Sequence, residues 1–503
     1  MQKIFSDNQK ANLIYQDSLD NLTSQRVMQF VKHHNQYQRP RLERLDEYYK
    51  GLNVGILEQE SRRVDEDKAD HRAVHSFGKY IADFQTSFSV GNAITVKHDD
   101  DARLDTVEDT NNFDEINSDL FLDMTRFGRA YEYVYRGHDD LEHSVALSPL
   151  ETFIIYSLDV EPQPIMAVRY HLIDTIDDDV ISNEYRVETW TATEYTSYQP
   201  TSINGTPVQD EVSELYVFPM IEYKNNKFRI GDFENVIPLI DLYDAAQSDT
   251  ANYMTDLNDA MLVIKGDIDT LLQGSSMMSG IDPTDESAAM QLAKDKMEML
   301  KSMKSANMLL LKSGVSMTGQ QTNVDAGYIH KEYDVTGTEA YKDRLAHDIH
   351  KFSHTPDLTD ENFAGNASGV AMKYKVLGTI ELASTKRKAF EVGLYQRYNI
   401  IKSLENLSAS GMSVDPNEIR FVFTDNMPVD DVATIGQVVS AGARVPQEYL
   451  YQFLPNVTDP SEITDLLAQE QATQVQQARD SYGVQVDSEK ADDTNGTETE
   501  TNI

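Results

Sequence analysis

Apolar residues recur at helical spacing in the first ninety positions of the chain. Val27 and Phe30 begin one such series, which continues to the stretch YYKGLNVGI at 48–56, and a second series fills 73–91 and leads into SVGNAITV. This pattern predicts amphipathic helices that end on glycine turns. The polar, mixed sequence before them is expected to be an arm rather than a core element, at residues 1–24.

From about residue 128 to residue 223 the period changes to two. Tyr131, Tyr133 and Tyr135 lie on alternate positions, as in strands with one face toward water. Trp190 is the only tryptophan, and it lies in a further predicted strand, EYRVETWTATEYTSY. A packing role is expected for it, inside a β-rich region.

A much longer helical pattern starts at Val236 and runs to Ile264 almost without a break. Pro238 is compatible with it, because a proline in the first turn removes an N–H that has no intrahelical partner. About 28 residues at about 1.5 Å each make a rod of roughly 40 Å, more than twice the average helix length. We therefore expect a helix at 234–264 that is longer than a compact core requires.

A second rod is predicted at 336–355, in the stretch TGTEAYKDRLAHDIHKFSH. Thr336 and Glu339 have the spacing of a capping box at its start. The apolar residues of one helix face are Tyr341, Leu345, Ile349 and Phe352.

The next segment, DLTDENFAGNASG, favours a mobile loop at 356–369, because Asn and Gly tolerate left-handed backbone and offer little packing surface. A further long helix is predicted at 370–407. The pattern of this last helix holds seven Lys or Arg residues against three Glu. These side chains either contact nucleic acid or pair with acidic neighbours, and pairing is favoured for Lys386, Arg387 and Lys388.

Charge narrows the range of functions. The chain has 84 acidic and 44 basic side chains, a formal charge of -40, which argues against a surface built to hold nucleic acid phosphates. It contains no cysteine, which excludes disulfides and Cys-ligated zinc. With no signal-peptide core and no run of about 18 apolar residues, we expect an intracellular, soluble protein without a membrane span. The acidic tail at 478–503 is predicted to be disordered.

Catalytic motifs are missing from the sequence. It has no G-x-x-x-x-G-K-[ST] loop for phosphates, no H-E-x-x-H and no G-x-S-x-G. His347, His350 and His354 have the spacing of metal ligands on one side of a helix, but no carboxylate motif accompanies them and exposed histidines are favoured. We predict no catalytic residue, no cofactor and no metal ion.

Several short stretches follow one another in a specific order. They are YYKGLNVGI, FSVGNAITV, FPMIEYKNN with ENVIPLIDLYDA, NASGVAMKYKV, and RFVFTDNMPVDDVATIGQVVSAGARVPQEYLYQFLPNVTDP. In this order the chain resembles the portal proteins, or head-to-tail connectors, of tailed bacteriophages, in particular those of long-tailed siphophages. The resemblance spans about residues 25–475.

The resemblance implies an α+β, portal-type fold. Its parts would be the N-terminal arm at 1–24, a helix-rich wing containing a β domain at 25–233, stem helix 1 at 234–264, a small α/β clip at 265–335, stem helix 2 at 336–355, a tunnel loop at 356–369, a long wing/tunnel helix at 370–407, a helical crown at 408–477 and the disordered tail at 478–503.

The resemblance also implies a function without catalysis. Twelve subunits would form a ring at one vertex of the capsid, through which double-stranded DNA is packaged and ejected. The implied partners are other copies of the chain, the DNA, the packaging terminase, the scaffolding and major capsid proteins, and the head-completion adaptor, with no membrane. The implied location is the virion, and the host cytoplasm during assembly.

The tunnel loop is the implied contact with DNA. Twelve copies at -40 each would carry -480, so the channel should repel phosphates and touch the duplex only weakly, without regard to its sequence. The candidate channel residues are Asn362, Phe363, Asn366, Ser368, Lys373 and Lys375. The residues of the first rod that face the channel or the outside are expected to include some of Asp241, Asp244, Asp249, Asp256 and Asp259.

Two other functions are compatible with the residues alone. An acidic scaffold or adaptor without a DNA channel would bind basic partners through its charged surface and tail. A metal-dependent hydrolase would use the three histidines at 347, 350 and 354. Closed rings with a central hole would distinguish the portal from both alternatives.

Overall fold

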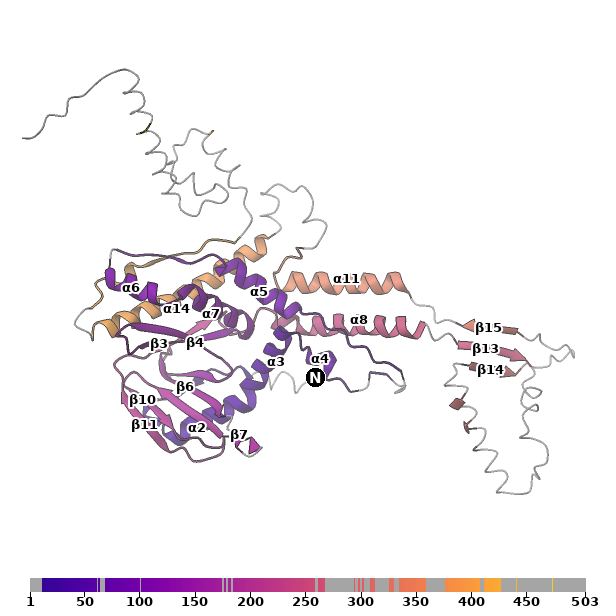
Figure 1. The fold of residues 1–503 in the computed structure, drawn as a ribbon, viewed down its shortest axis with the longest axis horizontal. Helices are drawn as coiled ribbons and strands as arrows, with labels where there is room; N and C mark the ends of the chain where they lie inside the picture. The colour runs from indigo at the N-terminus through magenta and orange to yellow at the C-terminus, as the bar shows by residue number, and fades with distance from the viewer. Residues whose placement is uncertain are drawn as a thin grey trace, which may run out of the picture. The chain divides into compact units, whose positions relative to one another are not determined.

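The computed structural model divides the chain into two compact units, Met1–Asn426 and Met427–Ile503 (Figure 1). The structure describes residues 11–60, 62–63, 68–99, 101–173, 176–177, 180–181, 184–257, 261–266, 308–312, 325–329, 334–358, 376–407, 411–426 and the isolated positions 294, 297–298, 301–302, 440 and 473. The predicted tail, and almost all of the predicted crown beyond residue 426, lie outside these residues.

Amphipathic helices open the first unit, as their period predicts. They are η1 (Leu19–Asn21), α2 (Ser24–His33), the π-helical turn η2 (His34–Gln38), α3 (Arg39–Lys50), α4 (Val54–Leu57) and α5 (Phe77–Val90). The Thr23 side chain caps α2 by accepting the N–H of Arg26. Gly51 ends α3 in the left-handed conformation, with φ of 75°, which confirms the predicted glycine stop.

The β-rich part contains two main sheets, which confirms the period-two prediction. Its strands are β1 (Tyr15–Gln16), β3 (Arg129–Arg136), β4 (Glu142–Leu147), β5 (Thr152–Tyr156), β6 (Pro164–Ile173), β7 (Ile176–Asp177), β8 (Val180–Ile181), β9 (Glu184–Trp190), β10 (Glu194–Tyr198), β11 (Gln209–Glu214) and β12 (Met220–Lys224). One sheet has the order β1-β5-β6-β9-β10-β11 and the other β12-β3-β4, while β7 and β8 form a separate two-stranded sheet.

Helices cover the sheet β12-β3-β4 (Figure 1). They are α6 (Ala102–Thr110), α7 (Phe113–Phe127) and α14 (Leu377–Glu405). Phe390 and Tyr398 of α14 pack in one buried core with Tyr223 of β12. Gly393 permits this approach, because a Cβ there would overlap the Tyr223 ring. Near the core, β2 (Thr95–Lys97) pairs with β16 (Arg420–Val422), which follows η4 (Pro416–Glu418).

The prediction of an arm outside the core is wrong for part of residues 1–24. Strand β1 pairs in parallel with β5, and Tyr15 is only 4% exposed. Its ring packs against Phe30 and Phe153 at 5.2 and 5.0 Å between centroids. A strand of two residues leaves no period in the sequence, so this core element had no local signal.

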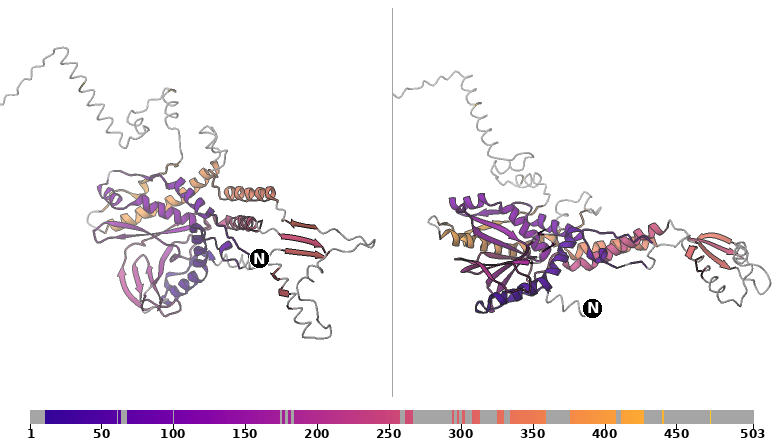
Figure 2. Two further views of the ribbon diagram at one scale, coloured as in Figure 1. Left: turned by 45° about the vertical axis from the view of Figure 1, so that its right-hand side comes forward. Right: turned by 60° about the horizontal axis from the view of Figure 1, so that its bottom comes forward.

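Two long helices lie side by side, α8 (Ile237–Leu257) and α11 (Val335–Phe352), preceded by η3 (Glu234–Val236) (Figures 1 and 2). The two predicted rods are therefore in contact with each other within one chain. None of the described helices combines the length and apolar character needed to cross a membrane.

The predicted extent of the first rod, to residue 264, is wrong. Helix α8 has 21 residues, about 32 Å at about 1.5 Å per residue. Met261–Gly266 forms strand β13, parallel to β14 (Met308–Lys312) and antiparallel to β15 (Asp325–Ile329). The run MLVIK is short and apolar, so its spacing alone cannot distinguish a helix from a buried strand, and pairing with two partner strands decides it.

Helix α11 begins on a different cap from the one predicted. The Asp334 side chain accepts the N–H of Gly337 at 2.9 Å, while Glu339 pairs with Lys342 at 2.5 Å. Thr336 and Glu339 therefore do not form the expected capping box, because the residue before the helix supplies a better-placed carboxylate. Of the predicted apolar face, Leu345 and Ile349 are buried, and Tyr341 and Phe352 are about half exposed.

Candidate functional site

The six candidate channel residues all fall within 359–375, outside the residues that the structure describes. They are Asn362, Phe363, Asn366, Ser368, Lys373 and Lys375. The structure does describe both ends of this segment, Leu358 after α11 and Val376 before α14. The candidate site is therefore built from the contacts that hold these two ends.

One backbone carbonyl joins three elements at the ends of the segment. The carbonyl oxygen of His354, just after α11, accepts the hydroxyl of Thr379 in the first turn of α14 at 2.7 Å. It also accepts an amide N–H of Gln85, a buried residue of α5, at 3.3 Å. His354 has a left-handed backbone, with φ of 52°, which turns the chain sharply after the helix. We call His354, Thr379 and Gln85 the clamp.

Two aromatic groups fix the chain beyond the clamp. The Nδ1–H of His350 donates to the carbonyl of Thr355 at 3.1 Å, and the hydroxyl of Tyr80 donates to the carbonyl of Pro356 at 2.9 Å. The two rings meet edge to face at 5.6 Å between centroids. Burial raises the pKa of Tyr80, so this hydroxyl keeps its proton and remains a donor at neutral pH.

The histidine triplet does not assemble as a metal site. His350 uses its ring for the contacts above, and His347 and His354 are exposed. Among the described residues, no group of three His, Cys, Asp or Glu side chains is placed to hold a metal ion.

The aspartates of α8 contact residues 44–75 of the same chain. Their partners are Tyr48 and Arg44 for Asp241, Asn53 and His75 for Asp244, Arg62 for Asp249, and Arg63 and Lys68 for Asp256. Asp244 is fully buried and accepts the Asn53 amide at 2.5 Å and the His75 backbone N–H at 2.9 Å. Asp249 is 72% exposed. Asp244 is therefore not among the outward-facing aspartates, whereas Asp249 is open to solvent in the single chain and Asp259 lies outside the described residues.

The basic residues of α14 mostly bind acidic groups within the chain. Lys386 pairs with Asp232, and both side chains are buried. Arg387 pairs with Asp425 at 2.5 Å. Burial lowers the pKa of Lys386, and the Asp232 carboxylate opposes that shift. The pairing prediction is confirmed for these two residues, whereas Lys388 is exposed and makes no ion pair with any described residue.

The deepest ion pair of α14 joins the helix to the covered sheet. The Nε of Arg397 donates to a carboxylate oxygen of Glu132 in β3 at 2.6 Å, and both side chains are at most 1% exposed. The hydroxyl of Tyr223 donates to the same carboxylate at 2.6 Å. This cation is therefore unavailable to a nucleic acid.

A comparison with protein families decides the identity of the fold. The family described as "Phage portal protein, SPP1 Gp6-like" matches residues 28–477. The chain belongs to this portal family. The portal protein of Bacillus phage SPP1 is 20% identical over 420 residues, covering 79% of this chain and 76% of the relative. That of Clostridium phage phiCD119 is 22% identical over 455 residues, covering 86% and 92%.

Solved structures of gene transfer agent particles are also similar to the chain. The neck of an empty GTA particle, computed with C6 symmetry, gives a TM-score of 0.39 at 11% identity, covering 83% of this chain and 98% of that one. The virion of a native GTA particle gives 0.38 at 10% identity, covering 80% and 99%.

Membership of the portal family gives the broad function. Portal proteins are structural components of the phage virion, at the capsid vertex through which DNA is packaged and ejected. The chain is thus a virion protein of mixed α+β fold that assembles with copies of itself.

Sequence reasoning missed the residues that hold the ends of 359–375. Gln85 and Tyr80 contact positions about 270 residues further along the chain. Their only local feature is a place on an amphipathic helix, and a single sequence carries no signal for such distant partners.

Proposed function

We propose that twelve copies of this chain form a ring at one capsid vertex, as the conduit through which double-stranded DNA enters and leaves. The same ring would be the docking platform for the packaging terminase and for the head-completion adaptor, and would contact scaffolding and major capsid proteins. The family match over residues 28–477 is the observation that carries this proposal. The conduit would have no catalytic activity of its own.

In this proposal α8 and α11 are the two stem helices, β13 to β15 belong to the clip, and α14 is the long wing/tunnel helix. Large apolar side chains on the paired helices support contacts with neighbouring copies. Those about half exposed are Leu242, Met254, Tyr341 and Phe352. Neighbouring subunits of a ring would remove such surface from water.

The segment at 356–369 is, in the same proposal, the tunnel loop. Its polar residues Asn362, Asn366 and Ser368, with Phe363, would touch the duplex, and Lys373 and Lys375 would follow behind them. The clamp supports this assignment, because a segment whose two ends are fixed can move in its middle without loosening the helices on either side.

A deletion tests the loop assignment. Removal of residues 358–367 should leave ring assembly intact and block the packaging or retention of DNA, measured as nuclease-protected DNA per particle. Loss of assembly would show that the loop is structural and that the tunnel assignment is wrong.

Removal of the clamp gives a finer test. The double variant Gln85→Met with Thr379→Val removes both donors to the His354 carbonyl at nearly constant side-chain volume. We expect assembled rings, a loss of roughly 1–2 kcal/mol in the free energy of unfolding, and less packaged DNA.

The matched control for the clamp is Thr385→Val. Thr385 lies on the same helix and donates only to the Glu381 carbonyl of its own turn, on the exposed surface. It should leave packaging unchanged. An equal defect in this control would mean that packaging does not depend on the clamp.

A further inference from the structure

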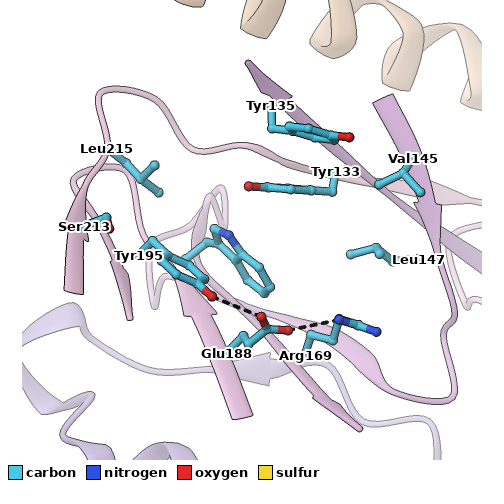
Figure 3. Close-up of a pocket in the computed structure, with 10 residues that line it drawn as sticks. Tyr133, Tyr135, Val145, Leu147, Arg169, Glu188, Tyr195, Ser213 and Leu215 are labelled. Carbon is cyan, nitrogen blue, oxygen red and sulfur yellow. Dashed lines mark hydrogen bonds and ion pairs between the residues drawn. The ribbon is translucent and has the colours of Figure 1, made fainter. Parts of the chain in front are cut away.

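A cleft of about 500 Å³ lies between the two sheets of the β-rich part (Figure 3). Tyr133 and Tyr135 of β3 line it from one sheet, and Trp190 of β9 and Tyr195 of β10 line it from the other. The tyrosines of β3 stack at 5.2 Å between centroids, and Trp190 lies 5.4 Å from Tyr133 and 5.5 Å from Tyr195. Trp190 is 4% exposed, which confirms its packing role, but Tyr135 is 37% exposed. The cleft is therefore a half-open aromatic site.

Charged groups form the other part of the cleft (Figure 3). The Glu188 carboxylate accepts a hydrogen bond from the guanidinium of Arg169 at 3.0 Å and another from the hydroxyl of Tyr195 at 3.0 Å. Arg186 lies two residues before Glu188 on the same strand and so on the same sheet face. Burial, then the charge of Glu188, raises the pKa of Tyr195 to about 12, so its hydroxyl remains a donor. Arg169 is already neutralised by Glu188.

The edge strand β11 adds carboxylates at the border of the cleft. Ser213 lines the cleft and is paired with Tyr195. Residues two apart on a strand share a face, so Glu211 is on the cleft side and Glu214 on the opposite side. All six residues of β11 are exposed, and three of them are acidic with no basic residue among them. β11 is the last strand of this sheet in the described part of the chain, so one of its backbone edges pairs with no described strand.

We propose that this cleft, with the β11 edge beside it, binds a basic segment of a protein partner, which presents an arginine to the aromatic rings and to Glu211. A guanidinium stacks on aromatic faces and pairs with carboxylates, and it is less strongly hydrated than an ammonium group. This edge of β11 can receive backbone hydrogen bonds from the same segment.

Charge decides against other occupants. If two copies of the chain paired through β11, the three carboxylates of one strand would lie against the three of the other, and like charges opposite each other repel. A nucleic acid would meet an acidic edge on a chain of formal charge -40. A basic protein segment is the class of partner that complements both features. This inference concerns the β-rich part alone and does not depend on the proposed channel.

Trp190 provides the test, because it is the only tryptophan in the chain. The full-length protein is titrated with an acetylated, amidated tetra-arginine peptide while Trp190 fluorescence is recorded. We expect a saturable change that weakens with added salt, and no change with tetra-glutamate. Absence of any saturable change with tetra-arginine at low salt would overturn the proposal.

Two variants of one strand separate specific binding from general attraction. Glu211→Gln and Glu214→Gln remove the same charge from opposite faces of β11, and neither residue is buried. Glu211→Gln should weaken peptide binding about three- to fivefold, and Glu214→Gln less than twofold. Equal weakening by both would mean attraction to an acidic surface and would overturn the proposal. A Trp190 signal that depends on protein concentration without peptide would show that a second copy occupies the cleft, which would overturn it as well.

Discussion

At the scale of single residues, two buried carboxylates lie beside two arginines where β4 meets the end of α14. Arg136 donates to Glu142 at 2.7 Å and Arg103 to Glu405 at 2.7 Å, and neither carboxylate is more than 1% exposed. Burial, and then the neighbouring Glu405, raises the pKa of Glu142 to about 8. The folded chain therefore holds a proton here that the unfolded chain releases.

This proton makes stability depend on pH. A glutamate with an ordinary pKa of 4.5 and a folded pKa of about 8 stabilises the fold below pH 4.5, and this contribution is lost as the pH rises toward 8. Glu142→Gln keeps an acceptor for Arg136 but no longer titrates. Its loss of stability between pH 5 and pH 8 should be smaller than that of the unmodified chain, by roughly 3 kcal/mol in thermal unfolding, at about 1.4 kcal/mol per pKa unit.

The control for this prediction is Glu43→Gln. Glu43 is 46% exposed and pairs with Arg39, so both pH values should give unfolding free energies within about 0.5 kcal/mol of the unmodified chain. Equal destabilisation of Glu142→Gln at both pH values would show that the carboxylate is ionised and that its ion pair with Arg136 dominates.

At the scale of elements, the aspartates of α8 hold this helix against residues 44–75 of the same chain. Asp244→Ala would leave the Asn53 amide and the His75 backbone N–H without their acceptor in a buried place. We expect a loss of roughly 3 kcal/mol in the free energy of unfolding, measured by chemical denaturation. Asp249→Ala, on the same helix but 72% exposed, should cost less than about 1 kcal/mol. Equal costs would mean that burial does not separate the two aspartates.

The same helix shows what the sequence can and cannot predict. Its three- and four-residue spacing and Pro238 in the first turn predicted a rod, and α8 confirms it. The end of the rod was wrong, since Met261–Gly266 pairs with strands about 50 and 60 residues further on. The orientation of Asp244 was equally inaccessible, because it depends on residues nearly two hundred positions earlier. The spacing of apolar residues predicts that a helix forms. Contacts with residues far away in the sequence determine where the helix ends and which of its polar side chains are buried.

The predicted channel residues lie outside the described part of the chain, so the comparison concerns only the contacts at the two ends of their segment. The loop at 356–369 was placed between two helices, and α11 and α14 are where those helices were expected. The histidines at 347, 350 and 354 were expected to be exposed, but His350 is only 14% exposed and its ring holds the chain after the helix. Gln85 of the clamp could not be predicted, because its contact with His354 exists only where the fold places α5 beside the end of α11.

At the scale of the whole molecule, the distribution of charge matters more than any single group. The chain carries -40, and of the seven basic residues predicted in its most basic helix, Lys386, Arg387 and Arg397 are bound to carboxylates of the same chain. Such a body offers little for DNA phosphates to hold. Weak attraction to phosphates is appropriate for a protein that lets a DNA duplex pass. It would be a disadvantage for a protein that must hold DNA in place.

Negative-stain electron microscopy of the purified full-length protein shows whether copies of this chain form a ring around a channel. We expect closed rings with a central hole, seen end-on, and class averages with one dominant rotational symmetry. Monomers or dimers at every salt and protein concentration tested would contradict this expectation.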